Sequence, residues 1–467
     1  MSPKIIKSLA CVAVVVAFMF LPVPDGLTAH TWHILGLYLG TVLAIVLRPF
    51  PEPVVLITSM AFLSIYYLDL KSSLSEFASS TSWLILTAFV IGECFVITGL
   101  GKRIAYFLID KFGHTTLRLG YVSTLTDFIL SPAVPSNTAR SGGLVYPIFQ
   151  SLAYTLDSYP DKNPNRVGSF FMSLLYQNSL TTGTLFITAG AIMPMMIHFC
   201  NEIMGGDISW VTWAMAMLVP GGLLLLITPY VVYRINTPEL KEVDNKALAK
   251  AGREEIGPMS TKEKTLAGLF VLAILGWLTG SITKIPTTAI ALGFLAVATL
   301  TNVISWKHVL DVKAGWSTFV WYSGIMSISG ALTKGGFFIW LGKWFQHHLN
   351  LGGVDHIIAM AILILVTMLV RYFFASTIAY VVTFVPVIFT IGNVLDLPAI
   401  PLLLLVAASA QIASLQTHYG NAVGPLLFGA GYVSQKKWWT IGHIIAYYSM
   451  VVYFIVGLAW WKVIGLW

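Results

Sequence analysis

The chain has 467 residues, of which 57% are hydrophobic and 10% are charged, whereas about 25% of the residues of a soluble domain are charged. Apolar runs of roughly 20 residues, the length that crosses a bilayer, recur from end to end. The composition therefore excludes a soluble globular protein and predicts a multi-pass helical membrane protein. The net charge of +7 does not indicate nucleic-acid binding, because the basic residues cluster in short loops, as the positive-inside rule expects.

The first apolar segments are expected to span the membrane. Residues 1–24 resemble a signal peptide, but no small-residue cleavage site follows the apolar run, so we expect a retained first helix. The basic, amphipathic stretch 102–118 favours a helix that lies along the membrane interface. The expected spans before it are 8–22, 31–48, 53–68 and 83–99.

A polar stretch, SPAVPSNTARSGGLVYPIF at 131–149, follows within apolar sequence. Its two early prolines, Pro132 and Pro135, and its paired glycines do not suit a spanning helix. Irregular backbone occurs at membrane depth only where it is buried in protein or lines a cavity. We therefore predict a re-entrant hairpin over 119–153, with its hydroxyl and amide groups facing a ligand.

The remaining segments divide at one hydrophilic stretch. Before it, a segment over 168–199 is interrupted by QNSLTTGT at 177–184, and a span is expected over 209–233. The stretch 237–264 is basic, and we predict a cytosolic linker there. After it we expect spans over 265–281, 285–304, 316–333 and 357–370, an interfacial stretch over 337–349, a hairpin over 371–391, an interrupted segment over 399–432 and a last span over 439–465.

The two halves repeat with an offset of 239 residues. Subtracting 239 places 375–377 on 136–138 and Pro386 on Pro147. Interrupted hydrophobic segments at matching places in two halves indicate the binding site of a transporter. The same offset also pairs the interrupted segments, placing Gln416 on Gln177 and Gly429 on Gly190.

Four polar interruptions are therefore expected to converge on one site. They offer neutral hydrogen-bonding groups beside helix N-termini, which hold anions through free N–H groups and partial positive charge. The sequence shows no paired intramembrane carboxylates, which argues against an organic cation as the ligand, and a small anion with several oxygens is predicted. The candidate residues are Ser136, Asn137, Thr138, Thr181, Thr182, Gly183, Thr184, Ser376, Thr377, Thr417, His418 and Asn421.

Each single residue also has a structural interpretation. Ser and Thr often join membrane helices without touching a ligand, and His418 could be a hydrogen-bonded core histidine. Arg140 could brace the hairpin rather than contact substrate. Asp127 could cap a helix, pair with a neighbour or relay a proton. Lys334 and Arg371 are expected at the membrane interface.

The motifs PSNTARSGG, FFAST and THYGNAVGPLLFGAGYV, the last at 417–433, resemble the divalent anion/sodium symporter family. The last two are most similar to the bacterial citrate/succinate, tartrate/succinate and 2-oxoglutarate/malate exchangers. The resemblance implies an all-α membrane protein with two inverted repeats, about 11 transmembrane helices and two re-entrant hairpins. It also implies a homodimer in the inner membrane that moves di- or tricarboxylates by an elevator mechanism.

The resemblance further implies a division of the chain into a fixed scaffold and a mobile transport domain. The scaffold would comprise 1–118 and 265–370. The transport domain would comprise 119–236 and 371–467, and the linker would be 237–264. In this family a Ser-Asn-Thr motif on each hairpin grips the carboxylates and helps to form two sodium sites.

The first motif is complete, so a sodium-like site at Ser136 and Asn137 remains open. In the second hairpin Ala375 replaces Ser and Ser376 replaces Asn, which removes oxygen ligands for sodium. We hypothesise sodium-independent anion exchange, in which His418, and with it Arg140, supplies positive charge in place of sodium.

The alternatives are a sodium-coupled symporter of the same fold, a channel and a membrane enzyme. The sequence lacks the charged rings of a channel and the metal cluster or nucleophile pair of an enzyme. We expect no cofactor, and no partners other than carboxylate anions, lipid and a second copy of the chain.

Overall fold

The computed structural model describes residues 2–67, 70–348 and 353–467, and the named elements in them are all helices. The first half follows the expected order closely. An N-terminal helix and three further apolar helices precede an amphipathic helix, a hairpin, a broken helix and a long last helix. These elements are α1 (Pro3–Phe20), α2 (Ala29–Leu47), α3 (Glu52–Tyr66), α5 (Ser80–Thr98), α6 (Leu100–Phe112), α7 (Thr116–Leu130), η2 (Thr138–Val145), α8 (Tyr146–Thr155), α9 (Gly168–Leu185), α10 (Ile192–Met204) and α11 (Trp210–Ile235).

The second half repeats the order of amphipathic helix, hairpin, broken helix and last helix. Within the described residues, seven helices are long and apolar enough to cross a membrane. An eighth crossing results if α17 and α18, which meet at a 61° bend, count as one span. The main elements are α13 (Thr261–Leu278), α15 (Thr287–Leu300), α17 (Lys313–Lys334), α18 (Phe337–His348), α19 (His356–Arg371), α20 (Thr377–Val394), α21 (Ala399–Ile412), α22 (Val423–Gly429), α23 (Gln435–Val452) and α24 (Leu458–Val463).

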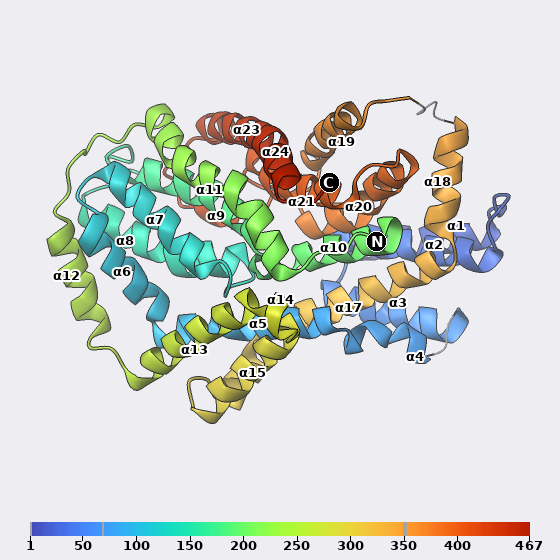
Figure 1. The fold of residues 1–467 in the computed structure, drawn as a ribbon, viewed down its shortest axis with the longest axis horizontal. Helices are drawn as coiled ribbons and strands as arrows, with labels where there is room; N and C mark the ends of the chain where they lie inside the picture. The colour runs from blue at the N-terminus through green and yellow to red at the C-terminus, as the bar shows by residue number, and fades with distance from the viewer. Residues whose placement is uncertain (1, 68–69, 349–352) are drawn as a thin grey trace.

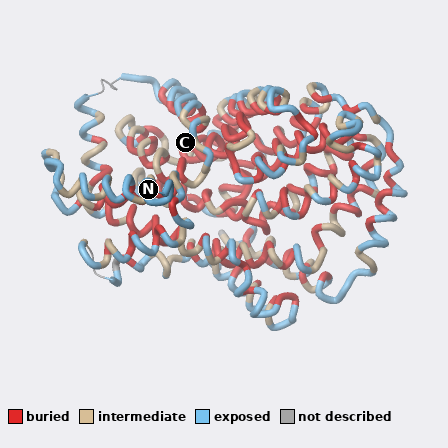
Figure 2. Tube along the Cα trace, turned by 180° about the vertical axis from the view of Figure 1, so that it is seen from behind, coloured by how far each residue is buried: buried red, intermediate tan, exposed pale blue. Residues whose placement is uncertain are grey.

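The helices form two groups that lie side by side in Figure 1. One contains α3, α5, α13, α15 and α17, and the other contains α7 to α11 with α21, α23 and α24. The first arms of the broken helices are deeply buried, since every residue of α9 and all but two residues of α21 are buried. Figure 2 shows the same pattern, with buried residues through the middle of the molecule and exposed residues on the peripheral helices.

The hydrophilic linker contains a helix, α12 (Asn245–Ile256), which the sequence alone did not predict. It packs along α6, to which Asn245 donates a hydrogen bond at the Ile109 carbonyl (3.0 Å). Arg253 and Lys246 both pair with Asp110, at 3.0 and 3.2 Å. Their hydrogen bonds, that from Arg253 first, lower the pKa of Asp110. The linker therefore braces α6, whereas its counterpart α18 packs mainly against α20.

The structure corrects the first predicted interruption. The QNSLTTGT sequence at 177–184 is not a break but the last two turns of α9, where all eight residues are buried. The chain leaves the helix at 186–191 instead. Polar side chains are compatible with a buried helix when neighbouring helices satisfy them.

The second hairpin is longer than predicted. Its first arm is α19 (His356–Arg371), predicted as a separate span, and its second arm is α20 after a turn at 372–376. In the second broken segment the break covers 413–422. Gln177 and Gln416 are therefore not structurally equivalent, because the first lies within α9 and the second at the end of a 3₁₀ turn.

Candidate functional site

A cavity of about 1210 Å³ lies where the two hairpin turns meet the two helix breaks. The first hairpin contributes 135–138 and the second contributes 373–379. The breaks contribute 190–192 and, from the second, Tyr419, Asn421 and Ala422. The opposite wall comes from α2 and α17, so the cavity separates the hairpins from the first group of helices.

Three helical segments of the hairpins and helix breaks begin at this cavity. They are η2, which starts at Thr138, α10, which starts at Ile192, and α20, which starts at Thr377. Their first N–H groups have no partner within the helix, and their dipoles place partial positive charge at the cavity. The arrangement is suited to bind an anion that carries negative charge at more than one point.

The two turns are built in the same way. The Ser136 hydroxyl accepts a hydrogen bond from the Ala139 N–H, and the Ser376 hydroxyl accepts one from the Ala379 N–H, both at 3.3 Å. This capping pairs Ser136 with Ser376, an offset of 240 rather than the predicted 239. The second motif therefore keeps its Ser and has Thr377 in the place of Asn137.

The extra residue of the first hairpin lies after its turn. Pro147 follows Ser136 by eleven residues, whereas Pro386 follows Ser376 by ten. Between Ser136 and Pro147 the chain forms the π-helical segment η2, and a π-bulge is the usual way for a helix to hold one additional residue. The one-residue difference explains why the prolines and the turns have different offsets.

Arg140, on η2, is fully buried behind the first turn. Its guanidinium donates to the carbonyls of Val134 (2.9 Å), Ala189 (3.3 Å) and Ser179 (3.2 Å). It also donates to the side chains of Asn137 (3.1 Å) and Thr182 (3.0 Å). The turn, the break and the broken helix thus form an oxygen cage around one cation.

The Asp127 carboxylate neutralises this first cage. Its Oδ2 lies 3.3 Å from Arg140 Nε, and its Oδ1 accepts a hydrogen bond from Ser141 (2.5 Å). Thr182 donates to its other oxygen. Asp127 is therefore a buried ion-pair partner, which selects the pairing role among those proposed from sequence.

Arg371 forms a second cage of the same design. It was expected at the membrane interface, but only 1% of its surface is exposed. Its guanidinium donates to the carbonyls of Phe374 in the turn, Gly420 in the break and Ala410 in the broken helix, the last at 3.2 Å. It also donates to the Thr377 hydroxyl at 2.7 Å. None of the described carboxylates forms an ion pair with it.

The structure brings half of the predicted residues to the cavity. Its lining includes Ser136, Asn137, Thr138, Ser376, Thr377 and Asn421. Thr182 lies behind them as a partner of Arg140 and Asp127. Thr181 and Thr184 donate to carbonyls of their own helix, at 3.2 and 2.7 Å. Gly183 packs against Asn137, because a Cβ there would lie 2.7 Å from the Asn137 amide oxygen.

Thr417 and His418 do not line the cavity. The Thr417 carbonyl accepts a hydrogen bond from the Tyr176 hydroxyl at 3.0 Å. The His418 ring stacks against Phe428 and Trp439, and its Nδ1 accepts a hydrogen bond from the Trp439 indole at 3.0 Å. The structure therefore places Arg371 directly behind the second turn, whereas the His418 ring lies outside the cavity lining.

Two lining or supporting residues were missed from sequence. Gln411 lies at the end of the otherwise apolar α21 and accepts a hydrogen bond from the Asn137 amide at 3.4 Å, joining the first turn to the second broken helix. A single amide in an apolar span was the available signal. Arg371 is likewise a single charged residue in an apolar segment, but its position at the end of that segment also suits an interfacial residue.

Comparison with known proteins finds a family model over almost the whole chain. Residues 2–467 match the model described as the sodium:sulfate symporter transmembrane region. The inner membrane protein YbhI of Escherichia coli is 41% identical over 96% of this chain and 95% of that protein. The putative malate transporter YflS of Bacillus subtilis is 34% identical over 99% of this chain and 97% of that protein. An L-tartrate/succinate antiporter of Escherichia coli is 33% identical over 98% of each chain.

A solved structure supports the fold. The YdaH transporter of Alcanivorax borkumensis superimposes with a TM-score of 0.55 over 84% of this chain and 87% of that one. The sequence identity is 11%, so this likeness concerns the helical architecture alone.

Proposed function

Because the chain belongs to the sodium:sulfate symporter family, we propose that it exchanges C4–C6 di- and tricarboxylates across the inner membrane without sodium. Family membership confirms the resemblance drawn from the hairpin and broken-helix motifs, and it makes the chain a transporter rather than an enzyme. The names of two relatives, a putative malate transporter and an L-tartrate/succinate antiporter, support carboxylates as substrates. The name of a third supports the inner membrane.

The cavity chemistry supports a carboxylate anion. Hydroxyl and amide groups from both turns face the space, and three helix N-termini begin there. Such groups donate hydrogen bonds to carboxylate oxygens without fixing a net charge. A dicarboxylate held between the turns would be bound at each end by one Ser-capped turn, with Asn137 beside one carboxylate and Thr377 beside the other.

The observation that carries sodium independence is the pair of arginine cages. Hard cations bind to clusters of carbonyl, hydroxyl and amide oxygens, and each cage is a cluster of this kind that already surrounds a guanidinium. Asp127 neutralises the guanidinium of Arg140, so the proposed fixed positive charge is that of Arg371. A carrier with permanent positive charge at its site is costly to move when empty, which favours exchange over net transport.

The division into a scaffold and a transport domain remains part of the proposal. The cavity lies between the hairpins with their broken helices and the wall of α2 and α17, which is where an elevator would slide. The homodimer expected from the family is likewise proposed. We assign α19 to the transport domain rather than to the scaffold, because Arg371 at its end donates a hydrogen bond to the Gly420 carbonyl in the second break.

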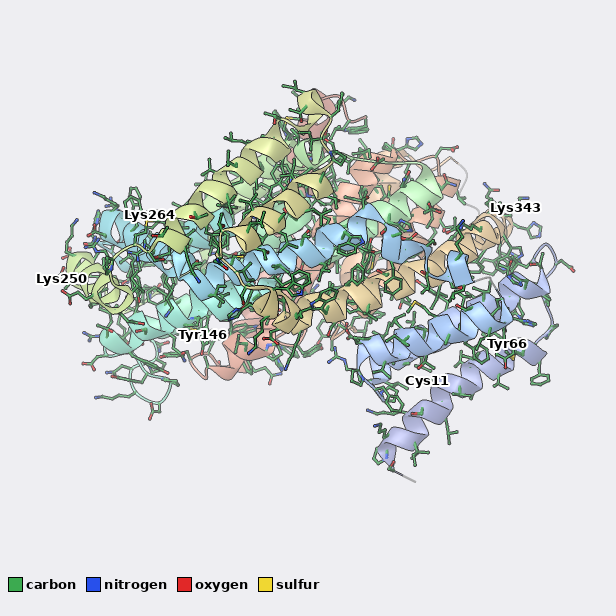
Figure 3. The ribbon with its side chains drawn as sticks, turned by 90° about the horizontal axis from the view of Figure 1, so that it is seen from below. Cys11, Tyr66, Tyr146, Lys250, Lys264 and Lys343 are labelled. Carbon is green, nitrogen blue, oxygen red and sulfur yellow. The ribbon has the colours of Figure 1, made fainter. Side chains whose placement is uncertain are left out.

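We also propose that this conformation is open to the cytosol. Lys4 lies over the Phe50 ring at 4.3 Å, so the N-terminus adjoins the loop after α2, which borders the cavity. The N-terminus and the α6–α12 region carry many lysines and arginines, which favours the cytosolic side. Figure 3 shows Lys250 and Lys264 at one end of the molecule and Tyr66 and Lys343 at the opposite end.

The test is counterflow with purified protein in liposomes. Vesicles preloaded with unlabelled succinate, and empty vesicles beside them, are given labelled succinate in sodium-free choline buffer. We expect uptake only into the preloaded vesicles, unchanged when sodium replaces choline.

Uptake into empty vesicles that needs an inward sodium gradient would instead establish a sodium-coupled symporter. Malate, 2-oxoglutarate, tartrate and citrate are tested in the same way, with sulfate as the alternative that the family description suggests. Exchange of sulfate but of no carboxylate would overturn the proposed substrate class.

A further inference from the structure

The cavity contains one pair of charged side chains that the proposed mechanism does not use. Arg48, after α2, and Glu52, at the start of α3, both border the cavity that holds the hairpin turns. Within its described lining they are the only charged residues. The Arg48 side chain is 64% exposed and that of Glu52 is 23% exposed, so the pair lies at the open edge of the cavity.

The local sequence fixes Arg48 in an unusual conformation. In the segment Arg-Pro-Phe-Pro-Glu, Arg48 caps the C-terminus of α2 with φ of +50°, in the left-handed region. Glycine usually occupies such a position, because a side chain there costs about 1 kcal/mol. Strain of this kind at a cavity edge is more common where the side chain has a function. Pro49 and Pro51, which follow Arg48 in the chain, restrict the backbone conformations of this loop.

The wall behind Arg48 is apolar. Leu39, Val42, Leu43 and Val46 line the cavity from one face of α2, at helical spacing. An anion that moves from solvent toward the turns therefore meets the Arg48–Glu52 pair, of which Arg48 is the more exposed partner, and then a stretch that offers it no charged group. Charge at the rim of a low-dielectric opening raises the local concentration of oppositely charged ligands.

The contact between Arg48 and Glu52 is weak. Arg48 Nη2 and Glu52 Oε1 are 3.8 Å apart, and the Arg48 side chain is mostly exposed whereas that of Glu52 is partly buried. Such a pair contributes little to stability and exchanges partners readily. A substrate carboxylate can therefore replace Glu52 at Arg48 at small cost, while the displaced carboxylate remains close by as a negative charge.

We propose that Arg48 is a specificity-determining residue that collects dicarboxylates at the cytosolic mouth, with Glu52 as its resting partner. Glu52 also repels a third negative charge, so it favours dicarboxylates over tricarboxylates on this side. The inference rests on the proposed function and adds a step before the turns bind the anion.

The experiment measures KM from each side of the membrane. Inside-out vesicles present the cytosolic face to the medium and right-side-out vesicles present the external face, both with saturating succinate in the lumen. The variants are Arg48→Gln, Arg48→Lys and Glu52→Gln. The control is Lys307→Gln, which removes an exposed charge near the start of α16 (Trp306–Asp311), outside the cavity lining.

For succinate we expect Arg48→Gln to raise KM about three- to tenfold in inside-out vesicles and to change it less than about twofold in right-side-out vesicles. The difference in KM between Arg48→Gln and wild type in inside-out vesicles should shrink at about 0.5 M salt, because salt screens exposed charges. Arg48→Lys should lie near wild type. Glu52→Gln should lower KM, and lower it more for citrate than for succinate.

Equal KM values for Arg48→Gln and Lys307→Gln in inside-out vesicles would overturn the inference. Carboxylate exchange by the wild-type protein in the same experiment would still support the proposed function. If Arg48→Gln shows no exchange at saturating succinate, Glu52→Gln decides, since an unchanged KM and an unchanged citrate-to-succinate ratio would overturn the inference. Wild type without carboxylate exchange would overturn both.

Discussion

The two hairpins each surround a buried arginine with the same kinds of oxygen, but they differ in net charge. Each guanidinium binds a turn carbonyl, a break carbonyl, a broken-helix carbonyl and the residue after the capping serine. Arg140 also has Asp127, whereas Arg371 has no described carboxylate. The first cage is therefore neutral without substrate, and the second keeps one positive charge.

The difference suggests separate tasks for the two cages. A neutral buried ion pair holds a structure together and loses much when one partner is removed. A buried cation with neutral partners only is stabilised further when an anion comes close. The first hairpin would then maintain the site, and the second would attract the substrate.

The largest effect is expected from Arg140→Gln, which leaves Asp127 buried and unpaired. Removing one partner of a buried ion pair costs about 3–5 kcal/mol. We expect a large fall in the melting temperature of the detergent-solubilised protein. In Asp127→Asn/Arg140→Gln most of this loss should be recovered, because no unpaired charge remains. A double variant as unstable as the single one would show that Asp127 is not the reason.

The next effect is expected from Arg371→Gln, which leaves no buried carboxylate behind. Its stability should fall less than that of Arg140→Gln, but counterflow of succinate should fall at least about 30-fold, since losing a charged contact costs about 2 kcal/mol or more. Addition of sodium should restore part of the exchange, because the emptied cage still offers oxygens. Stability losses of equal size in the two variants would remove the distinction between the cages.

A smaller effect is expected from Gly183→Ala, which tests the support of the first turn. The added Cβ would meet the Asn137 amide oxygen at 2.7 Å, and overpacking costs about 1–3 kcal/mol. We expect KM for succinate to rise about tenfold, since 1.4 kcal/mol is a factor of ten. The control is Gly190→Ala, whose Cβ would lie 3.6 Å from Gln411, an ordinary contact. Similar KM values for the two variants would count against a role for the position of Asn137.

The smallest effect is expected from His418→Ala. The ring stacks outside the cavity, so sodium-independent exchange should stay within about twofold of wild type, and the lost hydrogen bond from Trp439 should cost about 1 kcal/mol of stability. The readouts are counterflow in choline buffer and thermal unfolding. Loss of exchange in a stable His418→Ala protein would return the charge-compensating role to His418 and weaken the case for Arg371.

Much of the architecture was predictable because it depends on local properties. Apolar length defines the membrane helices, and the prolines and glycines near Ser136 exclude a regular helix there, so the hairpins could be inferred. That Ser136 and Ser376 both cap the helix after the turn was visible only in the structure. A repeat at a nearly constant offset then identified the second turn. The linker helix α12 was missed because its buried face is short and made of few apolar residues, Leu248, Ala249 and Gly252, and its packing partner α6 is distant in the sequence.

The sequence by itself determined the fold class and the two polar turns, because these follow from composition and from residues close together in the chain. Only the tertiary structure decided which cation serves each turn. Arg371 and Gly420 are 49 residues apart, and His418 is the nearer neighbour of Gly420 in sequence, yet Arg371 makes the contact. The direction of a side chain around its helix, and a one-residue shift in register, depend on packing between distant helices.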